Sequence, residues 1–247
     1  MSVDRKMKTV LQTINLRKIY GQDANAVAAL RGVSLTVASG EFVAVVGPSG
    51  CGKSTFLHLC GGMDRQTEGR VVVGGVDLNE LDDEALTRVR REQIGFVFQS
   101  FNLLPTLTLV ENIALPVMLA GIPQAICRDR AEEGARQVGL SHRLEHYPSQ
   151  VSGGELQRAA IARALVHQPV LLIADEPTGN LDSENGERVL RLLKTLTSGT
   201  VAILLATHDK ALASAADRVL RMRDGTELPS PESVLVEPLQ VGLELRE

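Results

Sequence analysis

The sequence predicts an α/β fold in which a mainly parallel sheet is covered by helices on both faces. Two fully apolar segments, VLLIAD at 170–175 and VAILLATH at 201–208, are separated by a helical pattern at 184–197. A third buried strand is expected at 42–46, where a glycine-rich loop and then a helical stretch follow it. Continuous apolar strands that alternate with helices are typical of parallel sheets buried on both sides.

The elements around this core follow in order. Strand-like segments at 26–37 and upstream at 9–16 indicate an N-terminal antiparallel region. After the glycine-rich loop, strands are expected at 70–75 and 93–99, with a helix at 81–92 between them.

The second half adds a helical region and a tail. Residues 100–166 are expected to be mostly helical, broken by Pro105, Pro116, Pro123 and Pro148. The prediction is one domain over 1–225, with the helical region inserted at about 100–166, followed by an acidic C-terminal tail at 226–247.

Composition and charge exclude several classes of protein. A net charge of −4, an aromatic content of 3% and the absence of tryptophan argue against nucleic acid as a partner. No apolar run approaches the ~20 residues that a membrane span requires, and the N-terminus lacks the apolar region of a signal peptide. Cys51, Cys60 and Cys127 share no metal-ligand spacing and are expected to be reduced thiols.

The glycine-rich loop GPSGCGKST, at 47–55, matches the pattern G-x-x-x-x-G-K-[ST]. Its glycines let successive N–H groups face a phosphate at a helix N-terminus. Lys53 can reach the outer phosphates, and the Ser54 hydroxyl can bind Mg²⁺. A loop that only joins a strand to a helix would not require this lysine and serine, so the pattern predicts a P-loop NTPase (RecA-like) core.

A second group of polar residues follows the expected strands. Asp175 and Glu176 end the strand at 170–175, where carboxylates meet ligands at the carboxyl edge of an α/β sheet. Asp175 is placed to hold Mg²⁺, directly or through water, and Glu176 to polarise an attacking water. Gln99 and His208 end their own strands, and each residue alone is better explained as an ordinary polar residue leaving a sheet. Because both lie at the same strand edges, their side chains could reach the γ-phosphate and its water.

The segment VSGGE, at 151–155, precedes another expected helix. Ser152 and Glu155 fit a capping box, which accounts for the start of that helix. A capping box does not require Gly153 and Gly154, whose missing side chains indicate the close approach of an anion to the helix N-terminus.

Together these motifs resemble the ATP-binding-cassette (ABC) ATPases. The phosphate loop, Gln99, VSGGE, VLLIADEP, the NLD at 180–182 and His208 occur in the order of that family, over about residues 8–225. The VSGGE segment departs from the usual pattern, since Val151 stands where leucine is usual and Glu155 where glutamine is common. Neither change removes the serine or the glycines.

The resemblance implies ATP and Mg²⁺ as cofactors and assigns the roles. Glu176 would be the general base, His208 and Gln99 would hold the γ-phosphate and its water, and Tyr20 would stack on adenine. The nucleotide phosphates would be bound by Gly47, Ser49, Gly50, Cys51, Gly52, Lys53, Ser54 and Thr55. Mg²⁺ would be bound by Ser54, Gln99 and Asp175. Cys51 inside this loop leaves oxidative inhibition open.

The resemblance also implies partners. Two ATPase subunits would stack head to tail, so that Ser152, Gly153 and Gly154 contact the partner's ATP, with Asp182 near the seam. The segments FNLLPTLTLVENIALP and ADEPTGNLDS are similar to the lipoprotein-release and macrolide-export group, which implies a separate integral-membrane permease and a cytoplasmic position on the inner face of the cell membrane. The apolar surface expected to receive the permease, or else to be core, comprises Phe101, Leu103, Leu104, Leu107, Leu109 and Val117.

Two other functions within the resemblance are possible. A regulatory ABC ATPase would activate a membrane partner for cell-wall remodelling without transport. DNA-associated or translation-factor ABC ATPases typically have a long coiled coil or two cassettes in one chain, and this sequence has neither.

Overall fold

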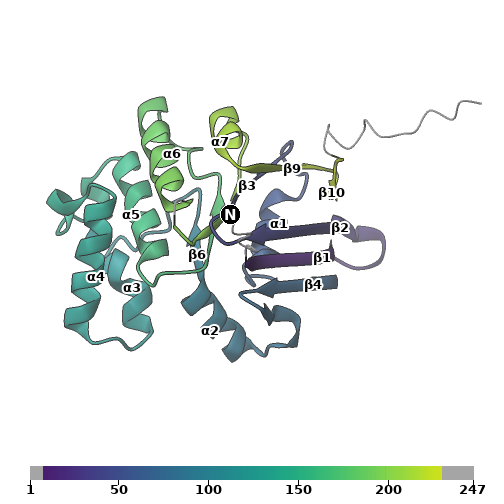
Figure 1. The fold of residues 1–247 in the computed structure, drawn as a ribbon, viewed down its shortest axis with the longest axis horizontal. Helices are drawn as coiled ribbons and strands as arrows, with labels where there is room; N and C mark the ends of the chain where they lie inside the picture. The colour runs from purple at the N-terminus through teal and green to yellow at the C-terminus, as the bar shows by residue number, and fades with distance from the viewer. Residues whose placement is uncertain (1–7, 198, 230–247) are drawn as a thin grey trace, which may run out of the picture.

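The computed structural model describes residues 8–197 and 199–229. Most of the acidic tail expected at 226–247 therefore lies outside the described residues. The chain forms two sheets and a group of helices that extends to one side of them (Figure 1).

The larger sheet is the predicted parallel one. Its six strands are ordered β10-β9-β3-β8-β7-β6, and every pair is parallel except β9 with its antiparallel neighbour β10. The strands are β3 (Phe42–Val46), β6 (Ile94–Val97), β7 (Leu171–Asp175), β8 (Ala202–Ala206), β9 (Arg218–Arg223) and β10 (Thr226–Glu227). Parallel pairing places the carboxyl ends of the four adjacent strands β3, β8, β7 and β6 at one edge.

The smaller sheet is the predicted antiparallel region, ordered β2-β1-β4-β5. Its strands are β1 (Thr9–Tyr20), β2 (Val27–Ala38), β4 (Glu68–Val73) and β5 (Val76–Asp77). The strand expected at 70–75 belongs to this sheet, so the chain returns to it after the first helix of the core.

Helices cover both faces of the larger sheet, as the apolar strands require. Val43 and Val45 pack in one buried cluster with Phe56, whereas Phe42 packs in another with Val189. Helices α1 (Lys53–Cys60), α2 (Asp83–Gln93), α6 (Ser183–Thr197) and α7 (Lys210–Ala215) contribute residues to these clusters. Since successive residues of β3 face different clusters, both faces of this strand are apolar, and it has no polar alternation.

The predicted helical region consists of α3 (Leu109–Leu119), α4 (Gln124–Gln137) and α5 (Gly153–Leu165), which lie together at the left of Figure 1. They share a buried cluster of their own, which includes Ile113, Ala131 and Ala162. None of the helices within the described ranges is long and apolar enough to cross a lipid bilayer.

Two features differ from the sequence expectations. Pro116 lies inside α3 and does not break it. The lost backbone hydrogen bond is offset by packing, because Ile113 and Val117 on either side of it are fully buried. Strand β9 was not predicted, because its arginines alternate with buried Leu220 and Met222 and it lacks the continuous apolar run of the other strands.

Asn112 joins the start of the helical region to its core. Its side chain is fully buried in α3. The Oδ1 atom accepts a hydrogen bond from the Leu104 N–H at 2.7 Å, and Nδ2 donates to the carbonyls of Leu104 and Leu107, both at 3.0 Å, and of Thr108 at 2.9 Å. One amide therefore hydrogen-bonds four backbone groups of the loop at 104–108.

We expect Asn112→Leu to destabilise the fold by about 2–3 kcal/mol, because it removes the side-chain partner of the partly buried Leu104 N–H and Leu107 carbonyl. Urea unfolding followed by circular dichroism measures the change. The control is Gln124→Leu, which replaces an exposed amide on α4. Equal stability of the two variants would contradict the role of Asn112.

Candidate functional site

The phosphate loop (residues 47–55) connects β3 to α1, and its glycines serve different purposes. Gly50 and Gly52 have φ values of +77° and +101°, which glycine adopts without strain. No atom lies within 4 Å of a Cβ added at Gly50, so the backbone there is open to a ligand. A Cβ at Gly47 would lie 2.2 Å from the Met222 carbonyl oxygen, so Gly47 allows β9 to pack against the loop.

Lys53 is the first residue of α1, and its side chain folds back over the loop. Its Nζ donates to the carbonyls of Gly47 at 2.8 Å and Pro48 at 3.2 Å, and the residue is 9% exposed. No described carboxylate pairs with this ammonium. A buried cation at a helix N-terminus without an acidic partner favours the binding of an anion.

A cavity of about 380 Å³ lies beside the loop. Gly50, Gly52, Lys53, Ser54 and Thr55 line it from the loop side. The opposite side is formed by residues that no sequence motif marked, namely Val27, Ala28, Ala29, Arg31, Asp224 and Gly225. Ser49 is exposed and does not line this cavity.

Cys51 lies in the loop, but its thiol faces the protein interior. The residue is 3% exposed, and a Cβ at Gly47 would lie 2.7 Å from its Sγ. Only the backbone of Cys51 is therefore placed to meet a phosphate. The burial makes the thiol a poor target for oxidation.

Asp175 ends β7 at the edge where the loop follows β3, and β8 lies between the two strands. The Asp175 Oδ1 atom is buried and has no hydrogen-bond partner among the described residues. A carboxylate and the exposed Ser54 hydroxyl are the oxygen donors that Mg²⁺ prefers. The described residues contain no group of three or more His, Cys, Asp or Glu side chains that could hold a metal ion.

Glu176 and His208 are in direct contact. Glu176 Oε2 lies 2.9 Å from His208 Nδ1 and accepts a bond from the His208 backbone N–H at 3.3 Å. The backbone of Glu176 has a φ of +48°, and its N–H donates to the Ala206 carbonyl at 2.9 Å. A non-glycine residue in this strained conformation is typical of functional sites. No described residue hydrogen-bonds Oε1, which leaves that oxygen available to a water.

Gln99 reaches the loop that follows Glu176. The Gln99 carbonyl accepts a hydrogen bond from Asn180 Nδ2 at 2.9 Å. A Cβ added at Gly179 would lie 3.2 Å from Gln99 Nε2 and 3.6 Å from Glu176 Cβ. The structure therefore brings Gln99, Glu176 and His208 together at the ends of β6, β7 and β8.

Tyr20, at the end of β1, is held by charged neighbours. Its hydroxyl donates to Asp64 Oδ2 at 2.8 Å, and Lys18 Nζ lies 4.7 Å from the ring centroid. Partial burial and the Asp64 carboxylate raise the pKa of Tyr20, so the hydroxyl remains a donor. The ring is 42% exposed, and its stacking on adenine stays a prediction, since the cavity beside the loop is lined by other residues.

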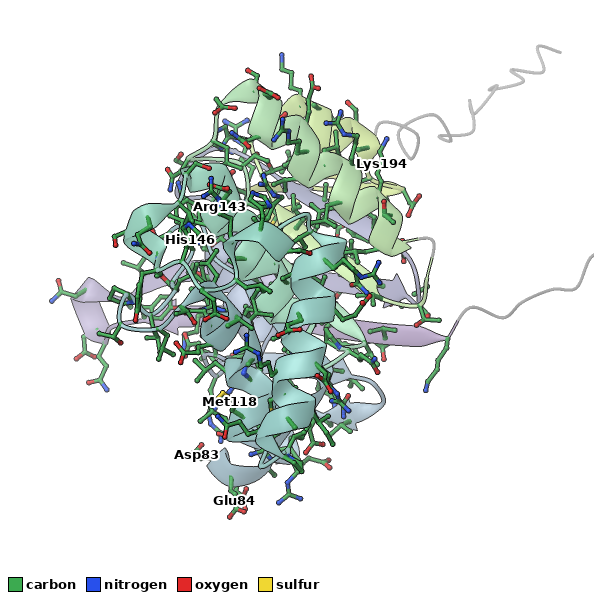
Figure 2. All side chains as sticks on the ribbon, turned by 90° about the vertical axis from the view of Figure 1, so that its left-hand side faces the viewer. Asp83, Glu84, Met118, Arg143, His146 and Lys194 are labelled. Atoms are coloured by element: carbon green, nitrogen blue, oxygen red, sulfur yellow. The ribbon has the colours of Figure 1, made fainter. Side chains whose placement is uncertain are left out.

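Ser152 is the N-cap of α5, and the predicted capping box is present. Ser152 N and Oγ donate to Glu155 Oε2 at 2.8 and 2.9 Å, and the Glu155 N–H donates back to Ser152 Oγ at 3.3 Å. Arg143 Nε donates to Glu155 Oε1 at 3.0 Å, and Arg143 lies beside His146 (Figure 2). The Ser152 N–H, the Ser152 hydroxyl and Arg143 lower the pKa of Glu155 to about 2, against an opposing effect of burial.

The two glycines of the SGG turn (Ser152–Gly154) differ. Gly153 is exposed, and the atoms nearest to an added Cβ are 3.9 Å away. Gly154 is buried, and a Cβ there would lie 2.2 Å from Asn185 Oδ1 on α6. A contact within the chain therefore explains Gly154, whereas Gly153 faces outward. In Figure 1, α5 lies with α3 and α4, away from α1 and the phosphate loop.

Known proteins share both the sequence and the fold. The family profile described as "ABC transporter" matches residues 30–179. An "Uncharacterized ABC transporter ATP-binding protein" of Thermotoga maritima is 47% identical, over 89% of this chain and 94% of its own length. The "Lipoprotein-releasing system ATP-binding protein LolD" of Geobacter metallireducens is 46% identical, over 89% and 98%. The "Macrolide export ATP-binding/permease protein MacB" of Shigella flexneri is 41% identical, over 92% of this chain but 35% of its own length.

Solved structures agree with this similarity. The cassette MJ0796, solved as a dimer in a post-hydrolysis state bound to ADP and Pi, has a TM-score of 0.81 and 41% identity, covering 88% of this chain and 96% of its own. A second dimeric structure of MJ0796, described as a bacterial ABC transporter cassette, gives the same values. The fold, the phosphate loop and these relatives show that the chain belongs to the ABC transporter family and is one of its ATP-binding ATPase subunits.

Proposed function

We propose that two copies of this chain close head to tail on MgATP and drive a separate integral-membrane permease from the cytoplasmic face of the cell membrane. The observation that carries the proposal is the outward-facing Gly153 at the N-terminus of α5, on a different part of the molecule from the phosphate loop. A helix N-terminus without a side chain suits the phosphates of an ATP that another subunit holds. The dimers of MJ0796, one of them with ADP and Pi, support this arrangement.

In this mechanism Glu176 accepts the proton of the attacking water through Oε1, while His208 holds the carboxylate through Oε2. Gln99, whose amide lies beside Gly179 as Glu176 does, would orient the same water. Lys53 leaves its loop carbonyls to bind the outer phosphates. Asp175 and Ser54 would hold Mg²⁺, which neutralises charge on the phosphate oxygens when bound.

The names of the relatives support an export function. LolD is named for lipoprotein release and MacB for macrolide export, which suggests a lipoprotein or another hydrophobic compound as the cargo of the permease. The chain's part is to convert ATP binding and hydrolysis into movement of the permease.

The surface proposed for the permease is narrower than the sequence suggested. Leu109 and Val117 are fully buried and belong to the core of the helical region, which is the alternative that the sequence left open for part of this set. Leu103 packs against that core, whereas Leu104 remains 44% exposed. The Asn112 amide fixes the backbone of Leu104, so this side chain is presented from a rigid loop.

For Glu176→Gln we expect ATP hydrolysis to fall by about 10²- to 10⁴-fold while MgATP binding persists. The amide oxygen can still accept the bond from His208, so the geometry is retained and only the base is lost. ATP should then remain trapped between subunits, and the variant should dimerise with ATP more readily than the wild type. Turnover and size-exclusion chromatography measure both effects, and near-normal turnover would remove Glu176 from the role of base.

A mixing experiment tests the shared sites. Lys53→Ala disables the phosphate loop, and Gly153→Asp places a carboxylate against the partner's phosphates. Gly153 is preferable to Gly154, where any side chain would collide with Asn185 of the same chain. In a mixed dimer one site collects both lesions and the other has none, so two inactive proteins should recover ATPase activity when mixed. Random pairing gives roughly a quarter of wild-type turnover if the sites are independent.

The control for this mixing is each variant alone at the same total concentration. Heterodimer formation is checked with two affinity tags. If heterodimers form and bind one ATP but hydrolyse no faster than the parents, independent composite sites are wrong.

Leu104→Asp should abolish co-purification with the membrane subunit and leave basal ATPase activity within about twofold, because a charge cannot enter an apolar contact. The matched control is Ile14→Asp, which alters an equally exposed apolar residue (43%) on β1, far from the helical region in Figure 1. Retention of the membrane subunit by the Leu104 variant would disprove this docking surface.

A further inference from the structure

Asn185 lies in the first turn of α6 and contacts two segments at once. Its backbone N–H and its Nδ2 donate to the two carboxylate oxygens of Asp182, both at 2.9 Å. Its Oδ1 points toward α5, where it lies 3.5 Å from Arg158 Nη1 and against the backbone of Gly154. The side chain is half-buried between the two helices.

The contact with Gly154 is tight enough to depend on glycine. A Cβ added at Gly154 would lie 2.2 Å from Asn185 Oδ1 and 2.3 Å from its Cγ. The amide therefore occupies the space that a side chain at 154 would fill. The N-terminus of α5 therefore packs directly against the Asn185 side chain.

The loop before α6 is fixed at its other end as well. Asn180 Nδ2 donates to the Gln99 carbonyl at 2.9 Å, and the Gly179 N–H donates to the Glu176 carbonyl at 3.0 Å. The segment 179–185 thus runs from the residues proposed for hydrolysis to the SGG turn.

We propose that Asn185 is a positioning residue for the second nucleotide site. It fixes the SGG turn to the Asp182 loop, so that both are presented to the partner subunit as one rigid surface. This inference rests on the proposed head-to-tail dimer. Asn185 touches no nucleotide in it and acts only through the position of Ser152 and Gly153.

The test uses Glu176→Gln as the parent, because ATP-dependent dimerisation is then measured without turnover. Asn185→Ala removes the support, and Asn185→Asp sets a carboxylate against that of Asp182. Both should raise the dimer dissociation constant in saturating MgATP by about tenfold or more, measured by analytical ultracentrifugation. The affinity of the monomer for a fluorescent ATP analogue should change less than about twofold, since the phosphate loop is untouched.

A matched control separates positioning from general destabilisation. Asn79→Ala likewise removes an amide that makes two hydrogen bonds, but its partners are the Val71 N–H and the Gly69 carbonyl of β4, in the antiparallel sheet. It should leave dimerisation at the parent's level. An equal loss for Asn79→Ala and Asn185→Ala would overturn the positioning role.

A double-variant cycle tests the contact itself. Gly154→Ala alone should weaken the dimer, because its methyl group collides with Asn185. Combined with Asn185→Ala it should cause no further loss beyond Asn185→Ala alone, since the methyl group then fills the vacated space. Additive losses would show that the two residues act separately and would overturn the proposal.

The outcomes also separate this inference from the function on which it rests. If the Glu176→Gln parent does not dimerise with MgATP, the head-to-tail function and the role of Asn185 fail together. If the parent dimerises and both Asn185 variants dimerise equally well, only the role of Asn185 fails.

Discussion

Parallel pairing of β3, β8, β7 and β6 is the constraint on which the site depends. The residues that follow these strands are far apart in the chain, yet parallel strands end at the same edge. The phosphate loop, Asp175, His208 and Gln99 meet there for this reason. The pairing in turn requires both faces of the sheet to be covered, which explains the two buried clusters on either side of it.

The geometry at this edge includes local strain. The positive φ of Glu176 costs of the order of 1–3 kcal/mol. Two bonds hold it in place: its N–H to the Ala206 carbonyl, and its carboxylate to His208. Ala206 is the last residue of β8 and His208 follows it closely, so the end of the neighbouring strand fixes the conformation of the proposed base. The strain is confined to Glu176, whose carboxylate points away from the direction of β7.

The sequence predicted the features that have a local signal. Apolar strands between helices indicated the parallel sheet, and the phosphate loop was visible because its glycines, lysine and serine are consecutive. Features that depend on tertiary contacts were not predictable. The glycine at position 154 is required by contact with Asn185, which is 31 positions away in the chain. Pro116 is accommodated within α3 by the packing around it. Strand β9 alternates like a strand with one buried face and has no continuous apolar run. The residues opposite the phosphate loop, such as Arg31 and Asp224, have no motif at all.

The departure at Glu155 from the family's usual glutamine has a physical consequence that the structure resolves. With a pKa near 2, Glu155 is ionised at neutral pH, and it lies at the N-terminus of the helix that is proposed to meet a phosphate. A free negative charge there would repel that phosphate. Arg143 Nε donates to its Oε1, while Ser152 N and Oγ donate to its Oε2, so both carboxylate oxygens are engaged within the chain. The pair with Arg143 offsets the added charge, and the N–H groups of the outward-facing SGG turn remain favourable for an anion.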